Sequence, residues 1–157
     1  MALLAKAVGV DPTKLVYVPF QGGGEAMTAL LGGHTDAATI DLAEAQAQLE
    51  AGKVRCLALL TDKRSTKFKD LPTTVEQGVN ATFVTWRGIY MAPGTKPEAV
   101  QWWTDALKKM LASPEWNAER ERLGWENTTR FGDEFKAHVS NELTGYKALL
   151  KELGFAK

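Results

Sequence analysis

Apolar and polar residues alternate along the first half of the chain in short blocks that predict strands and helices in turn. Three apolar blocks predict strands, at residues 15–18, 36–40 and 54–60. Two segments of helical character separate them, 24–31 and 42–51, and glycines follow each, as is common where helices end. This β-α-β-α-β order predicts a mostly parallel sheet flanked by helices, in which ligands bind at the carboxyl ends of the strands.

The pattern changes after residue 60. Residues 61–70 are polar and basic without an apolar period, which predicts an exposed loop. Residues 72–78 predict one turn of helix, in which Thr73 and Glu76 have the spacing of a capping box. Further strands are expected at 82–86 and 88–91, with a bend or an interdomain crossover at Arg87 and Gly88 between them.

Helical periodicity dominates from Pro93 onwards. Thr95 and Glu98 are spaced as a second capping box, and apolar residues then recur every three or four positions up to Leu111. A helix over 114–124, a brief strand over 125–129 and a long terminal helix over 135–153 complete the prediction. The apolar faces of these helices need a partner surface.

Composition and charge narrow the possible functions. The chain has 157 residues, 45% of them hydrophobic, and its 19 basic residues balance its 19 acidic ones, which gives no reason to expect a nucleic-acid partner. Cys56 stands alone in an apolar block and is interpreted as a core residue. Neither His34 nor His138 belongs to a nucleophile motif, and no metal-ligand cluster appears. We therefore expect no enzyme, no metal site and no cofactor.

The start of the chain carries no predicted targeting segment. The apolar segment at residues 1–9 is too short for a signal peptide, because Gly9 interrupts it early. No apolar stretch approaches the ~18 residues of a membrane span.

Three consecutive glycines, Gly22 to Gly24, follow the first predicted strand and open the first predicted helix. No Gly-Lys-Ser/Thr follows, and Met27 stands where the dinucleotide fingerprint has its last glycine, so nucleotide binding is disfavoured. One interpretation remaining is a cradle of backbone N–H donors for a carboxylate or a carbonyl. The alternative is a tight turn that merely needs positive φ. Glu25 could compete with an anionic ligand.

A second candidate loop lies at the end of the second predicted strand. Asp41 and Glu44 have capping-box spacing, so an N-cap role alone could explain Asp41. Thr39 and the N–H groups of Leu42 and Ala43 would face the same space as the glycine loop. Two polar ends would fit a dicarboxylate.

Ordered sequence strings resemble one known family across nearly the whole chain. The strings are YVPFQGG (17–23), ALLGG (29–33) with Asp36, AGKVRCLA (51–58), LPT (71–73) with Glu76 and Gly78, Gly88 with MAPGTKP (91–97), and Leu123-Gly124. They resemble the substrate-binding proteins of tripartite tricarboxylate transporters, also called Bug receptors. The resemblance implies a periplasmic receptor that closes on small carboxylates and hands them to a membrane transporter, without a cofactor.

The resemblance also implies an α/β fold and a domain organisation. Members have the two-lobed type II periplasmic-binding-protein fold, begin with a signal peptide and are roughly twice as long, near the size of a two-domain chain. This chain is therefore expected to correspond to their carboxyl-terminal half. Residues 1–86 would form the second lobe, and residues 87–157 the crossover and the helices that normally pack on the first lobe.

The family's second-lobe ligand loops map onto residues 20–24 and 39–43. The candidate ligand-binding residues are Phe20, Gln21, Gly22, Gly23, Gly24, Thr39, Asp41, Leu42 and Ala43. Gln21 stands where relatives often carry lysine, which with Glu25 argues against a simple dicarboxylate. Because the helical faces would be exposed without a first lobe, we expect a homodimer. The alternative is a stand-alone protein-interaction module that uses those faces and has no transport role.

Overall fold

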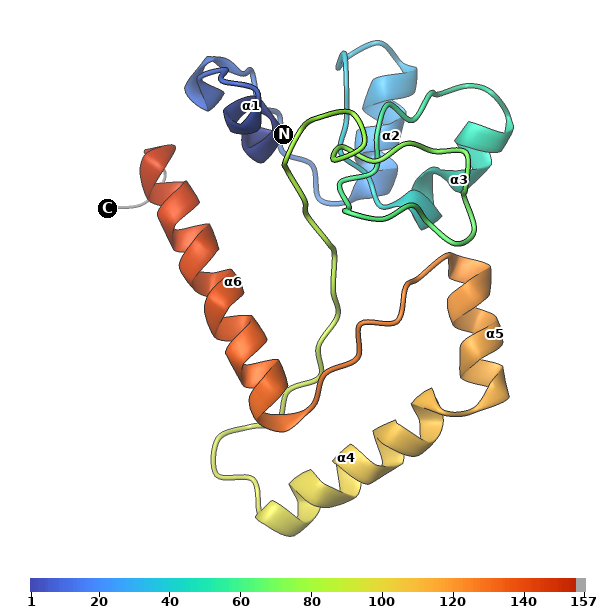
Figure 1. Ribbon diagram of the computed structural model, residues 1–157, viewed down its shortest axis with the longest axis vertical. Coiled ribbons are helices and arrows are strands. Elements are labelled where there is room, and N and C mark those ends of the chain that lie inside the picture. The colour runs from blue at the N-terminus through green and yellow to red at the C-terminus, as the bar shows by residue number, and fades with distance from the viewer. Residues whose placement is uncertain (155–157) are drawn as a thin grey trace. The chain divides into compact units, whose positions relative to one another are not determined.

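The computed structural model describes residues 1–154, which divide into two compact units (Figure 1). The first unit comprises Met1–Gly88 together with Arg120–Glu126. The second comprises Ile89–Glu119 and the chain from Asn127 onwards. The chain therefore passes from one unit to the other after Gly88, after Glu119 and after Glu126.

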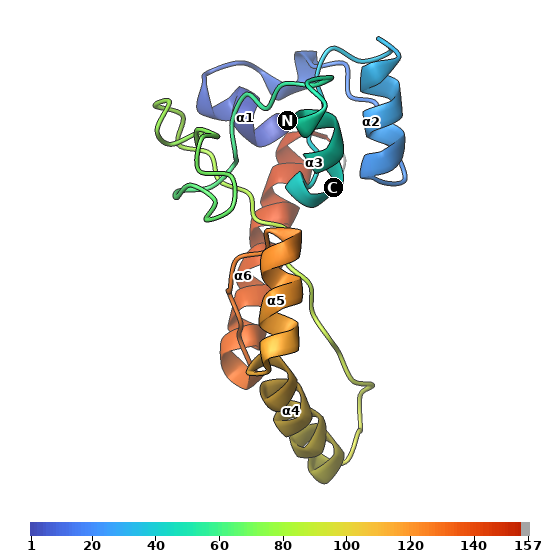
Figure 2. The same ribbon diagram turned by 90° about the vertical axis from the view of Figure 1, so that its right-hand side faces the viewer.

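The helices of the first unit are short. They are α1 (Ala2–Ala7), the 3₁₀ turn η1 (Pro12–Lys14), α2 (Gly23–Leu31) and α3 (Leu42–Glu50). The predicted helices at 24–31 and 42–51 are thus confirmed to within one residue at each end. Helix α1 contacts η1, and α2 packs against α3 (Figure 2).

The core of the first unit is made of small side chains. Ala26, Met27 and Ala29 form the buried face of α2, while Thr73 and Thr74 are buried in the loop region that follows α3. Thr73 is fully buried, with no exposed surface. Cys56, expected in the core, is only half-buried, and that burial raises the pKa of its thiol.

The predicted strands do not form: no described residue lies in a strand, which corrects the predictions at 15–18, 36–40, 54–60, 82–86, 88–91 and 125–129. One parallel bridge joins Leu59 to Thr73, through N–H···O bonds of 2.8 Å from Leu59 to Pro72 and from Thr74 to Leu59. An extended segment becomes a strand only where a neighbour supplies repeated hydrogen bonds. Val16, in the first predicted strand, is instead 95% exposed.

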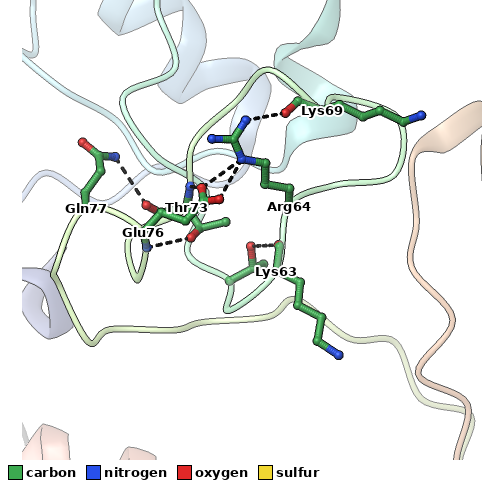
Figure 3. A network of polar contacts seen from close by, with 7 residues as sticks. Lys63, Arg64, Lys69, Thr73, Glu76 and Gln77 are labelled. Atoms are coloured by element: carbon green, nitrogen blue, oxygen red, sulfur yellow. Dashed lines mark hydrogen bonds and ion pairs between the residues drawn. The ribbon is translucent and has the colours of Figure 1, made fainter.

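A polar network holds the loop between residues 61 and 78 (Figure 3). Arg64 Nε donates to both carboxylate oxygens of Glu76, at 2.8 and 3.0 Å, and its Nη1 donates to the Lys69 carbonyl at 2.8 Å. The Thr73 N–H donates to Glu76 at 2.9 Å, and the Glu76 N–H donates back to Thr73 Oγ1 at 3.1 Å. The predicted capping box is therefore confirmed, although residues 74–78 form turns and not a helix.

The charge on Glu76 is stabilised by the same contacts. The hydrogen bond from Arg64, and after it the bond from the Thr73 N–H, hold the pKa of the Glu76 carboxyl below its ordinary value. Glu76 is exposed, so this network orders the loop at the surface while Thr73 anchors it in the core.

Residues 120–126 join the first unit through side-chain contacts with the same loop. Lys67 Nζ donates to Gln46 Oε1 at 2.9 Å and to the carbonyl of Arg122. Glu126 Oε1 accepts from the N–H and the hydroxyl of Thr66, each at 3.1 Å. The bonds to Arg122 and Glu126 connect positions 55 and 60 residues apart in the sequence.

The second unit is helical. It contains α4 (Pro97–Leu111), most of α5 (Pro114–Leu123) and α6 (Gly132–Glu152). The predicted capping box of Thr95 and Glu98 is wrong, because Lys96 is the N-cap of α4 and Thr95 Oγ1 donates to the Ala92 carbonyl at 2.7 Å. Pro97 explains the start, since proline presets φ and lacks the N–H that the first turn could not satisfy.

The apolar faces of α4 and α6 are largely exposed. No described residue of either helix is buried, and Trp103 of α4 and Leu143 of α6 are 49% and 50% exposed. Within the second unit, the ring of Tyr90 lies beside the ring of Phe135, with their centroids 5.5 Å apart. None of the described helices combines the length and apolar character needed to cross a membrane.

Candidate functional site

The glycine triplet forms the N-terminus of α2. Gly22 is the N-cap, with extended backbone at φ −170° and ψ 174°, and Gly23 and Gly24 are the first two residues of the helix. None of the three has positive φ, so the tight-turn alternative is wrong. Their N–H groups make no hydrogen bond within the described part of the chain. They are free donors at the positive end of a helix dipole.

Glycine at position 23 is explained by close approach of α3. A Cβ there would overlap the carboxylate of Glu44 and lie 3.1 Å from Ile40 Cγ2. At Gly22 and Gly24 a Cβ would meet nothing within 4 Å. The middle glycine therefore permits the two helices to pack, while its neighbours leave the backbone open to a ligand.

Two carboxylates contact this loop. Glu25 Oε2 accepts a hydrogen bond of 3.1 Å from the backbone N–H of Gln21, one residue before the triplet. The Glu44 carboxylate lies against Gly23. The Glu25 carboxylate therefore binds the N–H of Gln21, and the N–H groups of the glycine triplet stay unbonded among the described residues.

The second candidate loop places its residues around the start of α3. Asp41 is the N-cap, and its Oδ1 accepts from the Ala43 N–H at 3.1 Å, which confirms the capping interpretation of Asp41. That bond uses the Ala43 donor, whereas the Leu42 N–H has no hydrogen bond within residues 1–154. Glu44 does not complete a capping box, because its carboxylate turns to Gly23.

The remaining predicted site residues line the exposed side of the loops. Phe20 is 37% exposed. Gln21 and Thr39 are also exposed, and Thr39 makes no hydrogen bond to any described residue. The contacts of Gly23 with Ile40 and Glu44 join the two loops at one place, so the structure brings the two predicted segments together.

Arg87 is the charged residue that sequence reasoning did not assign to the site. Its Nη2 lies 3.6 Å from Asp41 Oδ2, and its guanidinium carbon lies 4.1 Å from the centre of the Trp125 ring. From the sequence, Arg87 was expected only at a bend or crossover between two predicted strands. The signal that could have identified it is a basic residue immediately after a predicted strand, at the edge where α/β ligands bind.

Other features of the described residues offer no rival chemistry. No three His, Cys, Asp or Glu side chains gather where they could hold a metal ion among residues 1–154. An apolar hollow of about 270 Å³ lies beside α1, between Leu15 and Val79, but it has almost no polar lining. The loops at the starts of α2 and α3 therefore remain the candidate site.

Known proteins with similar sequences and structures belong to one group. A UPF0065 protein from the gbd 5′ region of Cupriavidus necator is 30% identical over 141 residues, 90% of this chain and 43% of its own length. The structure of R. palustris Rpa4515 with adipate has a TM-score of 0.84 and 26% identity, covering 99% of this chain and 51% of that one. The periplasmic binding protein BugD has a TM-score of 0.78 and 27% identity over 99% and 52% of the two chains.

These likenesses support an α/β binding-protein fold, even though the described residues contain no strand. The chain spans about half the length of the relatives it matches. The family model "Tripartite tricarboxylate transporter family receptor" matches residues 1–155. The chain therefore belongs to this family of substrate-binding receptors.

Proposed function

We propose that this chain acts as a receptor for small carboxylates, and that the starts of α2 and α3 hold the solute. The observation that carries the proposal is the row of unbonded N–H groups at Gly22, Gly23 and Gly24. Such donors at a helix N-terminus bind a carboxylate through hydrogen bonds and through the dipole. The residues predicted to contact the solute also include Thr39 and Leu42.

Family membership supports the wider setting of this function. The neighbour at 26% identity was solved with adipate, a six-carbon dicarboxylate, and another neighbour is described as a periplasmic binding protein. We propose a periplasmic location and delivery of the solute to the membrane subunits of a tripartite tricarboxylate-type transporter. In this proposal residues 1–86 act as a second lobe, and residues 87–157 provide the crossover and the helices that normally pack on a first lobe.

A melting experiment tests the binding function directly. Adipate and shorter dicarboxylates are expected to raise the melting temperature of the chain, since a ligand that binds only the folded state stabilises it by about 2.7 kcal/mol at a hundred times its dissociation constant. The neutral diamide of adipic acid serves as the control of equal length and is expected to give no shift. Isothermal titration then gives the affinity. A panel of mono-, di- and tricarboxylates that leaves the melting curve unchanged would contradict the proposal.

We also propose that the chain pairs with a second copy. The support is the exposed apolar surface of α4 and α6, including Trp102 at 63% and Trp103 at 49% exposure. Light scattering coupled to size-exclusion chromatography is expected to give twice the 17.2 kDa mass of the chain. Trp103→Glu is expected to shift the mass toward the monomer, because it places a charge on the apolar face of α4. A monomeric mass for the unaltered chain at all concentrations rejects the pairing.

The same surface favours one second candidate function. An exposed tryptophan pair in edge-to-face contact, with centroids 5.1 Å apart, is the kind of side-chain cluster that protein interfaces use. In this alternative the chain is a protein-interaction module without a transport role. The melting experiment discriminates between the two, because the interaction module gains no stability from organic acids.

A further inference from the structure

Arg87 is held in position by two contacts within the first unit. Its guanidinium lies over the ring of Trp125 at 4.1 Å and faces Asp41 with an N···O separation of 3.6 Å. Stacking on an aromatic face fixes the plane of a guanidinium and is attractive in itself. The side chain of Arg87 is nevertheless 54% exposed, whereas that of Asp41 is 21% exposed.

The hydrogen-bonding capacity of this guanidinium is unused. Arginine carries five N–H donors, yet Arg87 donates no hydrogen bond to any residue in the described range. Its separation from Asp41 exceeds the ~2.7–2.9 Å of a charge-assisted hydrogen bond. Arg64 offers the contrast, since it donates to the Glu76 carboxylate and to the Lys69 carbonyl at 2.8 Å. Arg64 therefore donates hydrogen bonds from Nε and Nη1 within the protein, whereas Arg87 is oriented but donates none to a described residue.

The first turn of α3 connects Arg87 with the glycine loop. Asp41, the partner of Arg87, is the N-cap of that helix. Ile40 directly precedes Asp41, and Glu44 follows it by three positions. Both of these residues approach Gly23. Asp41, which faces Arg87, and Glu44, which lies against Gly23, are three positions apart at the start of α3, so this one short segment connects the guanidinium with the glycine triplet.

The charges around this stretch make the arginine necessary for a doubly charged solute. Glu25, Asp41 and Glu44 place three carboxylates around the two loops. Their field repels an anion, and a second carboxylate on the solute doubles that repulsion. Arg87 supplies the opposite charge beside them.

We propose that Arg87 selects dicarboxylates by binding the second carboxylate of the solute, while the glycine triplet binds the first. Without solute, Asp41 holds the Arg87 guanidinium in position. When the solute binds, its carboxylate replaces Asp41 as the partner of Arg87 and forms a bidentate pair. The proposal rests on the receptor function proposed above and adds the residue that sets its preference for two carboxylates over one.

Arg87→Gln tests the assignment through selectivity. Titrations compare adipate with hexanoate, which has the same chain length and one carboxylate. We expect Arg87→Gln to weaken adipate binding by about tenfold or more, equivalent to about 1.4 kcal/mol, and to change hexanoate binding by less than about twofold. Arg55→Gln is the matched control, because Arg55 is exposed and makes no hydrogen bond, ion pair or ring contact with a described residue. It removes the same charge and is expected to leave both affinities unchanged.

Asp41→Asn provides a second, independent test. Asparagine keeps the N-cap, since it is as good a capping residue as aspartate, but it removes the charge that competes with the solute. We expect adipate to bind several-fold more tightly to this variant, with hexanoate affected less. If Arg87 serves only as a contact within the fold, we expect both variants to lower the melting temperature. The ratio of the adipate affinity to the hexanoate affinity is then unchanged.

The outcomes separate this assignment from the receptor function. An unaltered chain that binds neither acid overturns the receptor function and the assignment together. An unaltered chain that binds adipate, with the same adipate-to-hexanoate ratio in Arg87→Gln, overturns the assignment alone. If Arg87→Gln does not fold, Asp41→Asn decides, and an adipate affinity no higher than that of the unaltered chain overturns the assignment.

Discussion

Replacing Thr73 with valine is expected to lower the free energy of unfolding by about 0.5–2 kcal/mol, the usual cost of losing a side-chain cap on a backbone N–H. Thr73 is fully buried, and its Oγ1 accepts the Glu76 N–H at 3.1 Å. Valine has the same shape but no acceptor, so that N–H loses its hydrogen bond. The loop carrying the Arg64–Glu76 pair is then less well anchored.

Denaturant titration measures this loss, and Thr82→Val is the control. Thr82 is exposed and has no hydrogen bond to a described residue, so the same substitution there is expected to change stability by less than about 0.5 kcal/mol. Equal effects of the two substitutions would show that Thr73 does not anchor the loop.

Adjacent glycines in α2 are expected to respond to alanine with opposite signs. Gly24→Ala meets no atom within 4 Å and replaces a poor helix former with the best one, so stability rises by about 0.5–1 kcal/mol. Gly23→Ala gains the same propensity, but its Cβ overlaps the Glu44 carboxylate and lies 3.1 Å from Ile40 Cγ2. Crowding against Ile40 costs about 1–3 kcal/mol, whereas the exposed Glu44 carboxylate can rotate aside at little cost, and we expect a net loss of up to about 1 kcal/mol.

The double variant Gly23→Ala/Glu44→Ala identifies the source of that loss. Because the contact with Ile40 remains when the carboxylate is removed, the double variant is expected to regain only a small part of the stability lost in Gly23→Ala, as measured by chemical denaturation with Glu44→Ala alone as reference. If Gly23→Ala proves as stabilising as Gly24→Ala, then α3 does not approach α2 as closely as described.

Local signals in the sequence predicted local structure well. Helices α2 and α3 begin and end within a residue of the expected positions, and the reciprocal bonds of Thr73 and Glu76 form as their spacing indicates. Capping and termination depend on groups only a few residues apart, so the sequence carries most of the information they need. Thr95 and Glu98 had the same spacing without forming a box, because Pro97 between them starts α4 from Lys96.

Strand predictions failed for a different reason. Apolar blocks such as residues 54–60 indicate a tendency to be extended and covered, but a strand also needs a partner at the right distance and register. Only the Leu59–Thr73 bridge supplies one within the described residues. The family was nevertheless predicted correctly from ordered strings spread over nearly the whole chain, which the match over residues 1–155 confirms.

The sequence by itself determined the helix boundaries of α2 and α3, the N-cap at Asp41 and the family, because each depends on neighbours along the chain or on ordered motifs. Only the tertiary structure decided that the glycine triplet needs no positive φ, and that Gly23 lies against Ile40 and Glu44 at the start of α3. Only the tertiary structure placed Arg87 between Asp41 and Trp125. Those contacts join residues tens of positions apart, and no local pattern encodes which distant side chains will meet.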